Sequence, residues 1–366
     1  RLSSEEFEKT EEANCPSSTR KIQLIIFCST MIAACVWIDE KELLYTCTRR
    51  STSAACSLYT HAHMRRILVV FNPVSGARLL RASTASVRRA IERRDAKVTW
   101  IETNPKNTDE LAQAILQPFE RIIVIGGDGT VREVAELLIH AGAKTPLAIV
   151  AAGSGNILAT SLGIPLFPLR SAVEFALNAP VETIDALRIN GKRICLIGAG
   201  QGYDTLFIQG ATRTLKKSIG PFAYAWSFLR TFLPYRANRY ALVVDGKRIR
   251  TMGKLVLALN MFSIIGVPIE RAVSPHDGWI DVFVLNPRTV WETLWTGIGF
   301  LVQRPRHAIP RLQAFRGKKV SIRMRKGRNI QVDGEIYPDK YLDISILPRA
   351  LRLVHRKTFD VAPTDA

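Results

Sequence analysis

Short apolar runs alternate with stretches of helical spacing over residues 64–151, and turn-forming residues bound each run. Continuous apolar runs of this length are typical of strands that are buried on both faces of a sheet. They occur at residues 67–71, 97–101, 121–125 and 147–151. Helical spacing of apolar residues occurs between them, at 77–94, 109–116 and 131–141. Strands that alternate with helices predict a parallel sheet with right-handed crossovers.

The second half of the chain has a different pattern, with many short strand candidates separated by turn signals. Asn190-Gly191 and Asp245-Gly246 are dipeptides that favour tight hairpin turns. The candidate strands are residues 181–189, 193–198, 240–244, 254–260, 280–285, 320–324, 329–332 and 342–346. The chain as a whole therefore predicts an α/β domain followed by a β-rich domain.

Three strands of the first half end in loops that are rich in glycine or other turn-forming residues. In a parallel sheet, ligands bind beyond the carboxyl ends of the strands, so these loops are expected to converge on one crevice. Glycines let the backbone approach an anion and present N–H groups to it, and the next helix adds a favourable dipole. The loops are Asn72-Pro73-Val74-Ser75-Gly76, Gly126-Gly127-Asp128-Gly129-Thr130 and Gly153-Ser154-Gly155-Asn156. Together they predict a site for phosphate groups.

Two acidic positions could act on a bound phosphate. Asp128 lies between glycines, where a carboxylate can act on Mg²⁺ directly or through water. Asp333-Gly334-Glu335 follows the strand predicted at 329–332, and phosphoryl transfer uses a carboxylate to orient a hydroxyl and accept its proton. A plain hairpin turn is the other interpretation of this tripeptide. The glycine spacing matches neither G-x-G-x-x-G nor G-x-x-x-x-G-K-[ST], which excludes an ordinary dinucleotide fingerprint and a Walker loop.

The charge of the chain is unbalanced, and the excess lies after residue 63. The 366 residues include 51 Lys and Arg against 32 Asp and Glu, a formal net charge of +19. Residues 1–63 are nearly neutral, contain no glycine and hold five of the six cysteines. A strongly basic protein favours anionic partners, namely nucleic acid, anionic lipid surfaces or phosphorylated substrates. Charge alone does not choose among them.

Residues 1–63 have two interpretations. A mostly apolar run at 22–38 follows Arg20-Lys21 and has about the minimum length of a membrane anchor, without a clear cleavage site. The abrupt change of composition at Met64 favours instead a tail that is not a folded domain, such as an overextended reading frame. We expect the second, so that an anchor at 22–38 exists only if the tail is part of the mature protein.

Taken as an ordered set, the three loops and Glu133 resemble the catalytic domain of the diacylglycerol kinase family, which includes bacterial soluble lipid kinases and sphingosine kinases. The resemblance runs from Arg65 to about Phe359. It implies a Rossmann-like domain of the NAD kinase and phosphofructokinase type at 64–185, then a β-sandwich-type lipid-substrate domain at 186–345. It also implies a return of the chain to the first domain at 346–360. ATP and Mg²⁺ are the implied cofactors, and a hydroxyl of diacylglycerol or a sphingoid-like lipid is the implied phosphate acceptor.

The resemblance also implies roles for single residues. Asp333 is the expected general base with Glu335 in support, although the order could be reversed. Asp128 and Asp185 are the expected ligands of the active-site metal. The resemblance further implies a structural magnesium loop, whose ligands would be Ser274, Asp277 and Trp279. A plain turn is the alternative interpretation of this loop. The nucleotide is expected to contact Asn72, Pro73, Val74, Ser75, Gly76, Thr103, Gly126, Gly127, Asp128, Gly129, Thr130, Val131, Arg132, Glu133, Gly153, Ser154, Gly155 and Asn156.

The sequence departs from the family pattern at two positions. Ile157 stands where bacterial diacylglycerol kinases have an Asp after the third motif, which puts a metal contact there in doubt. Arg132 replaces a small polar residue before the glutamate, and this side chain could meet phosphate or point to solvent. Cys195 lies in an apolar run and is expected to be a buried small residue. Residues 64–366 show no disulfide or zinc spacing, which fits a reducing compartment.

Two apolar and aromatic stretches, at 220–235 and 290–302, have roughly helical spacing. Core packing is the ordinary interpretation of such a stretch, and reception of an acyl chain is the alternative. Basic residues are dense at 304–328, and on a lipid kinase they could dock an anionic membrane surface. We therefore expect a cytoplasmic protein that is peripheral to the membrane. The oligomeric state stays open, a homodimer included.

Three other functions remain to be weighed against a lipid kinase. NAD kinases share the GGDGT motif, but we find no second Asn-Asp-type nucleotide motif. A nonenzymatic protein that binds ATP or lipid would be consistent with Ile157. Nucleic-acid binding is not expected, because no module with aromatic residues set for base stacking is recognisable.

Overall fold

A computed structural model describes residues 21–26, 34–39, 65–72, 84–90, 96–103, 108–153, 155–203, 205, 232–261, 263–264, 267–268, 273–301, 309–325 and 329–355. The chain divides into two compact units, Arg1–Met64 and Arg65–Ala366. In the first unit, strands β1 (Lys21–Ile26) and β2 (Ala34–Asp39) pair antiparallel, so the run at 22–38 includes strands rather than one helix. Over the described residues, no helix has the length and apolarity needed to cross a membrane.

The second unit begins with the parallel sheet that the sequence predicts. Its strands lie in the order β6-β5-β3-β4, and all three neighbouring pairs are parallel. The interiors of β3, β5 and β6 are almost wholly apolar and buried, which is why they appear in the sequence as continuous runs, whereas β4 is an edge strand with only Ile101 buried. The strands are β3 (Arg65–Phe71), β4 (Ala96–Glu102), β5 (Arg121–Gly126) and β6 (Leu147–Ala151).

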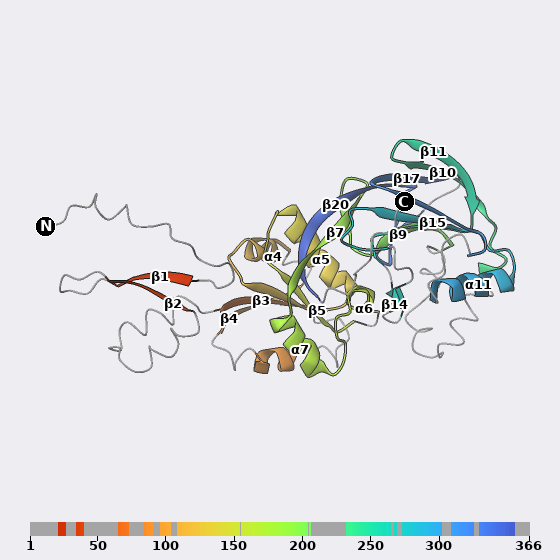
Figure 1. The fold of residues 1–366 in the computed structure, drawn as a ribbon. Helices are drawn as coiled ribbons and strands as arrows, with labels where there is room; N and C mark the ends of the chain where they lie inside the picture. Colours follow the sequence, from red (N-terminus) through yellow and green to blue (C-terminus); the bar gives the residue numbers. More distant parts are fainter. Residues whose placement is uncertain are drawn as a thin grey trace. The chain divides into compact units, whose positions relative to one another are not determined.

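Helices lie beside this sheet, as Figure 1 shows. The longest described one is α5 (Asp128–His140), which starts earlier than the spacing at 131–141 predicts because Gly127 is its N-cap. It buries Val131, Val134 and Leu138, which follow helical spacing. The other described helices of this half are α4 (Thr108–Ile115), α6 (Ile157–Ser161), α7 (Leu169–Asn178) and a helical segment at 84–90, within the helix predicted at 77–94.

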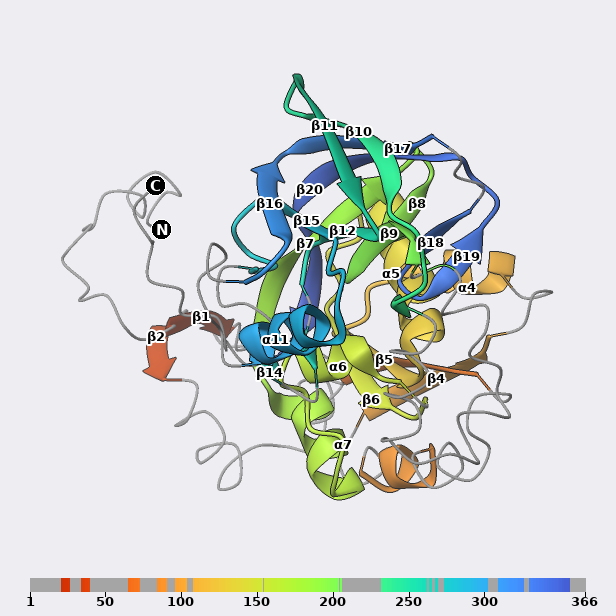
Figure 2. The same cartoon turned by 90° about the vertical axis from the view of Figure 1, so that its right-hand side faces the viewer.

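The second half is built from antiparallel strands, as expected. A six-stranded sheet has the order β16-β15-β12-β9-β18-β19. Its strands are β16 (Leu312–Gly317), β15 (Ile280–Leu285), β12 (Leu255–Leu259), β9 (Gly198–Gly202), β18 (Ile330–Val332) and β19 (Glu335–Tyr337). Side chains such as Val256 and Val282 pack from this sheet against Leu242 and Ile322 of the larger sheet. The fold is therefore a parallel α/β half followed by an antiparallel β half, visible from a second side in Figure 2.

The larger sheet continues past the parallel strands into the second half. Strand β20 (Tyr341–Val354) pairs antiparallel with β17 and β7, and Leu353 pairs parallel with Leu147 of β6. The remaining strands of this sheet are β7 (Val181–Ile189), β8 (Arg193–Cys195), β10 (Asn238–Val244), β11 (Lys247–Gly253) and β17 (Lys319–Met324). Two short strands, β13 (Ser263–Ile264) and β14 (Val267–Pro268), pair with each other, and helix α11 (Val290–Leu301) completes the described elements.

Candidate functional site

Two of the glycine loops, at 126–130 and 153–156, contact each other just beyond the carboxyl ends of β5 and β6. The amide of Ala152 donates to the carbonyl oxygen of Gly126 at 2.9 Å. A Cβ atom at Gly153 would lie only 2.5 Å from the Cα of Gly127, so neither position has room for a side chain. The sequence prediction that the loops at 126–130 and 153–156 converge is consistent with this contact.

Asn156 and Asp128 fix the shape of these loops. Asn156 has a φ of 51°, in the left-handed region, and its amide group exchanges two hydrogen bonds with the backbone of Gly153 at 2.9 and 3.0 Å. The carboxylate of Asp128 accepts the amides of Ile157 and Leu158, each at 3.0 Å. Asp128 therefore binds the start of α6 and joins the second loop to the third.

The first loop is described only at its start. Asn72 follows β3, and next to it the amide of Thr103 donates to the carbonyl oxygen of Phe71 at 2.7 Å. This bond holds the ends of β3 and β4 together. The predicted nucleotide contacts that lie outside the described residues are Pro73, Val74, Ser75, Gly76 and Ser154.

A cavity of about 360 Å³ opens in front of the GGDGT loop. Its lining comes from the end of β3, from the loop and first turns of α5, and from β19 in the antiparallel half. The lining residues are Asn72, Gly127, Gly129, Thr130, Arg132, Glu133, Glu136 and Glu335. The two halves of the second unit thus contribute to one cavity, and of the two DGE carboxylates only Glu335 lines it among the described residues.

Arg132 and Glu335 connect the walls of this cavity. The guanidinium of Arg132 on α5 forms an ion pair and hydrogen bond with Glu335 on β19, and it lies 3.9 Å from Glu136. The hydroxyl of Tyr337 donates to the same carboxylate at 2.7 Å. Although burial opposes it, the negative charge of Glu335 raises the pKa of Arg132 above its ordinary value. Of the two orientations that the sequence left open for Arg132, the structure has the one toward the cavity.

Asp333 points away from the cavity, into the protein. Its carboxylate accepts the amides of Leu196, Ile197 and Gly198 at 2.8, 2.9 and 3.0 Å, and the thiol of Cys195 at 3.1 Å. Burial raises the pKa of Asp333, and these hydrogen bonds lower it in part. The expectation that both DGE carboxylates face the cleft holds for Glu335 alone. Asp333 anchors the turn between β18 and β19 to the start of β9.

Neighbouring groups in the site also have shifted pKa values. Burial raises the pKa of Glu133, and the negative charges of Glu335 and Glu136 add to this, while Arg132 opposes it. Burial together with the charge of Asp333 raises the pKa of the Cys195 thiol well above its ordinary value. Cys195 is buried, as the sequence predicts, and it is neutral.

The predicted metal ligands form a second group of contacts. The buried carboxylate of Asp185 accepts the amides of Gly278 and Arg349, each at 2.7 Å, so it joins the predicted magnesium loop to β20. No described hydrogen bond joins it to Asp128. Asp277 accepts the amide of Trp279 at 3.0 Å and is paired with Arg316.

Burial raises the pKa of Asp277 to about 6, helped by the negative charges of Asp281 and Asp185 and opposed by Arg316 and the Trp279 amide. Among the described residues, no group of three or more His, Cys, Asp or Glu is arranged to hold a metal ion. The guanidinium of Arg316 stands next to the carboxylate where the resemblance implies a cation. The metal roles of Asp128, Asp185, Ser274, Asp277 and Trp279 stay predictions.

Tyr337 and Arg193 belong to the site although the sequence did not indicate them. Tyr337 is two residues from Glu335 on the same strand, so both side chains lie on one face of β19. The Arg193 guanidinium lies 4.1 Å from the centre of the Tyr337 ring and pairs with Asp339 at 2.7 Å. The alternation after the DGE motif could have identified Tyr337, whereas Arg193 is brought in only by the tertiary fold.

Replacement of Gly153 by alanine is expected to separate the two glycine loops. Because the new Cβ would meet the backbone of Gly127 at 2.5 Å, we expect the free energy of unfolding to fall by about 1–3 kcal/mol. The affinity for ATP should fall as well, and both are measurable by denaturant unfolding and by nucleotide titration. Gly129→Ala is the control for the unfolding measurement, because its Cβ would meet only Glu335 Oε1, at an ordinary 3.5 Å. Equal losses in the two variants would contradict the close contact.

Comparison with known proteins is consistent with this division of the chain. The diacylglycerol kinase catalytic domain family matches residues 66–189. The YegS C-terminal NAD kinase beta sandwich-like domain family matches residues 199–355. The two matches lie in sequence on the parallel half and on the antiparallel half.

Whole-chain relatives agree with these matches. A Pseudomonas aeruginosa (strain UCBPP-PA14) protein named "Probable lipid kinase YegS-like" is 28% identical over 298 residues, which cover 78% of this chain and 93% of the relative. The "Diacylglycerol kinase" of Bacillus subtilis (strain 168) is 25% identical over 276 residues, which cover 74% of this chain and 90% of the relative.

A solved structure shows the same fold. The crystal structure of a diacylglycerol kinase from Bacillus anthracis str. Sterne has a TM-score of 0.65 at 20% identity, and the match covers 81% of this chain and 98% of that chain. At this identity the likeness concerns the fold alone. The two domain matches show that residues 66–189 belong to the diacylglycerol kinase catalytic domain family and residues 199–355 to the YegS C-terminal NAD kinase beta sandwich-like domain family.

Proposed function

We propose that the protein is an ATP-dependent lipid kinase, which transfers the γ-phosphate to a hydroxyl of diacylglycerol or of a related lipid, sphingoid-like lipids included. The observation that carries the proposal is the cavity in which glycine amides from the parallel half face a carboxylate from the antiparallel half. Family membership supports it, because kinases of this family use ATP. The names of the relatives, a lipid kinase and a diacylglycerol kinase, support the lipid acceptor.

In this proposal Glu335 is the general base. It is the DGE carboxylate that lines the cavity, and about half of its side chain is exposed, so a lipid hydroxyl can reach it. Asp333 is a positioning residue, because its bonds to residues 196–198 hold the hairpin that carries Glu335. This reverses the order of roles expected from the sequence.

Arg132 is proposed to bind the transferred phosphate. Arg132 pairs with Glu335, and it is the one cation among the described residues that line the cavity. The phosphates of a nucleotide carry more negative charge than a half-exposed carboxylate and accept a guanidinium in the same bidentate geometry, so they are the stronger partner. Arrival of the γ-phosphate would therefore draw Arg132 from Glu335 and leave that carboxylate free to accept a proton.

The cavity also suits a nucleotide that carries a cation. The carboxylates of Glu133 and Glu335 line it beside Arg132, and carboxylate oxygen is the donor that Mg²⁺ prefers. Mg²⁺ on the nucleotide would neutralise charge on the β- and γ-phosphates. The glycine amides at the start of α5 and the dipole of that helix then stabilise the remaining negative charge.

The test is incubation of the purified protein with γ-labelled ATP, Mg²⁺ and a panel of acceptors, followed by chromatography of the products. The panel contains diacylglycerol, monoacylglycerol, sphingosine and NAD. We expect label in an organic-extractable phospholipid together with an equal amount of ADP. Label in NADP would identify an NAD kinase-like enzyme, and ADP formation that no acceptor stimulates would contradict the lipid kinase.

A further inference from the structure

Helix α11 has its apolar side toward solvent, which is the reverse of an ordinary surface helix. Its outer positions follow the spacing i, i+1, i+4, i+5 and i+8, so they form one continuous face. Trp291 is 73% exposed and Trp295 is 45% exposed. The five residues of this outer face are Val290, Trp291, Leu294, Trp295 and Ile298. The interpretation of residues 290–302 as core is therefore wrong for this face.

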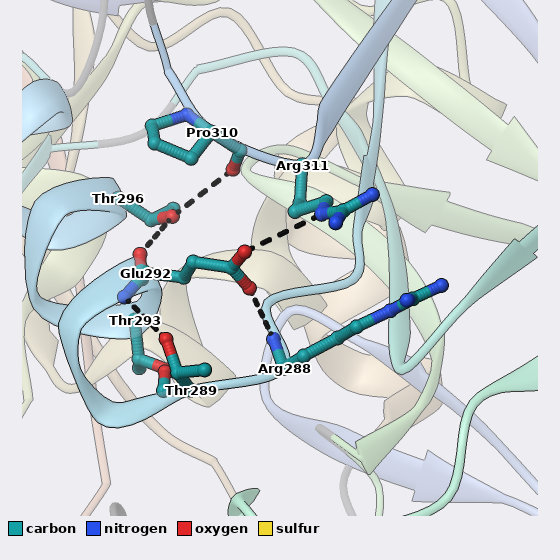
Figure 3. A network of polar contacts seen from close by, with 7 residues as sticks. All are labelled: Arg288, Thr289, Glu292, Thr293, Thr296, Pro310 and Arg311. Carbon is teal, nitrogen blue, oxygen red and sulfur yellow. Dashed lines mark hydrogen bonds and ion pairs between the residues drawn. The ribbon is translucent and has the colours of Figure 1, made fainter.

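Polar contacts fix the inner side of α11, as Figure 3 shows. The carboxylate of Glu292 accepts the amide of Arg288 at 2.6 Å and lies 3.4 Å from Arg311 Nε. The buried Thr296 donates to the carbonyl oxygen of Glu292 at 2.7 Å. On the same side, a Cβ at Gly299 would meet Ile309 at 3.0 Å. The Thr296 hydroxyl also lies 3.4 Å from the carbonyl oxygen of Pro310. Because Ile309, Pro310 and Arg311 lie outside the helix, α11 cannot rotate its apolar face inward without losing its contacts with them.

An arginine-lined hollow of about 670 Å³ lies next to the start of α11. Arg288 and Arg311 belong both to this hollow and to the network around Glu292. Met252, also in its lining, is 50% exposed. The six arginines of the hollow are Arg239, Arg250, Arg288, Arg311, Arg323 and Arg325. The described acidic partners are few, with Glu292 on Arg311 and Asp343 at 3.9 Å from Arg323.

We propose that the outer face of α11 and the arginine hollow form one docking surface for an anionic phospholipid bilayer. Tryptophans prefer the boundary between headgroups and acyl chains, and an exposed apolar helix face gains free energy there. Guanidinium groups bind lipid phosphates, and the formal charge of +19 attracts an anionic leaflet. A surface on which apolar and cationic residues lie side by side matches an anionic leaflet better than it matches a neutral one. The inference rests on the proposed function in that a diacyl lipid acceptor resides in a bilayer.

The surface is distinct from the nucleotide cavity. None of its residues is shared with the lining of that cavity. Figure 1 also shows α11 well apart from α4 and β4 of the parallel half. Docking can therefore be measured without ATP and without turnover.

The experiment measures flotation of the full chain with vesicles of phosphatidylcholine, with or without phosphatidylglycerol. We expect the wild type to bind only the anionic vesicles. Trp291→Ser with Trp295→Ser should lower binding at least about tenfold, because both rings lose their place in the interface. Arg239→Ser, Arg250→Ser and Arg325→Ser together should lower it about 100-fold, from about fivefold per arginine.

Controls of matched chemistry lie elsewhere on the surface. Leu116→Ser removes an apolar side chain that is 66% exposed, and Arg89→Ser removes an exposed charge. Both should bind anionic vesicles as the wild type does. Equal losses in these controls, or unchanged binding of the tryptophan and arginine variants, would overturn the docking surface.

Other occupants of the surface give different results. If inorganic phosphate displaced the wild type from vesicles at unchanged ionic strength, the hollow would be a site for a free anion and the proposal would fail. If the tryptophan variant converted a dimer into a monomer in sedimentation, the face would be an interface between copies, which also overturns it.

Turnover of a short-chain diacylglycerol without vesicles separates this inference from the proposed function. The docking variants should keep wild-type turnover of that acceptor. A wild type that docks but phosphorylates no lipid would support the surface while the kinase proposal fails, and an active kinase that does not dock would do the reverse.

Discussion

Glu335→Gln is expected to lower kcat for lipid phosphorylation at least about 100-fold, the usual scale for loss of a general base. The amide keeps the size of the side chain and can still accept the bond from Tyr337, but it cannot take a proton from the lipid hydroxyl. Arg132 loses its charged partner, so the affinity for ATP should stay the same or rise. Steady-state kinetics with ATP and lipid varied separately would measure both effects.

Glu136→Gln is the matched control for this variant. Glu136 lines the same cavity and lies 3.9 Å from the same guanidinium, as the i+4 partner of Arg132 on α5. Since an i, i+4 pair at this distance contributes little, we expect kcat to change by less than about threefold. A Glu335→Gln enzyme with full turnover, or equal losses in the two variants, would exclude Glu335 as the base.

Asp333→Ala is expected to lower the free energy of unfolding by about 3 kcal/mol or more, because each buried amide left without an acceptor costs about 1–3 kcal/mol. Three buried amides, of Leu196, Ile197 and Gly198, lose their acceptor in this variant. Activity should fall too, since the hairpin that carries Glu335 loses its anchor. Urea unfolding followed by circular dichroism measures the change in stability.

Asp245 offers a close control for Asp333. Both residues have a φ of 46°, both precede a glycine in a hairpin, and both accept backbone amides. Asp245, however, is exposed, so water can replace its carboxylate at the amides of Lys318 and Lys319. Asp245→Ala should therefore cost less than about 1.5 kcal/mol. If the two alanine variants lost the same stability, burial of the 196–198 amides would not explain the role of Asp333.

The sequence pattern predicted the parallel half well because apolar runs and helical spacing depend only on residues that are close together in the chain. Strands buried on both faces have to be continuous apolar runs, and β6 begins and ends where the pattern places it. In the antiparallel part, β7 also has the predicted bounds. Strands β9, β11, β13, β14, β16 and β19 were not predicted. β9 is rich in glycine because other atoms approach its backbone closely, and a Cβ at Gly198 would meet Leu259 at 2.6 Å. β11 carries four basic or polar residues on an edge of its sheet, so it lacks an apolar run.

The site was predicted at the level of motifs and not of roles. The tripeptide Asp333-Gly334-Glu335 does not itself indicate which of its two carboxylates faces the cavity. The choice depends on amides of residues 196–198, which lie more than a hundred positions earlier in the chain. The orientation of α11 was invisible for a similar reason, because the same periodicity fits a helix with its apolar face inward or outward. Only tertiary contacts, of Glu292 with Arg311 and of Thr296 with the carbonyl oxygen of Pro310, decide between them.

Strand β20 has a mechanical consequence. Its first residues are bonded to β17, its last pair with β6, and Asp185 secures the irregularity at Arg349 between them. The parallel half and the antiparallel half consequently share one strand, with a single irregularity, instead of being joined only by a loop. Loss of β20 from the sheet would disrupt both halves together, so we expect them to unfold in a single cooperative transition. Any closure around a substrate would then come from side chains and loops.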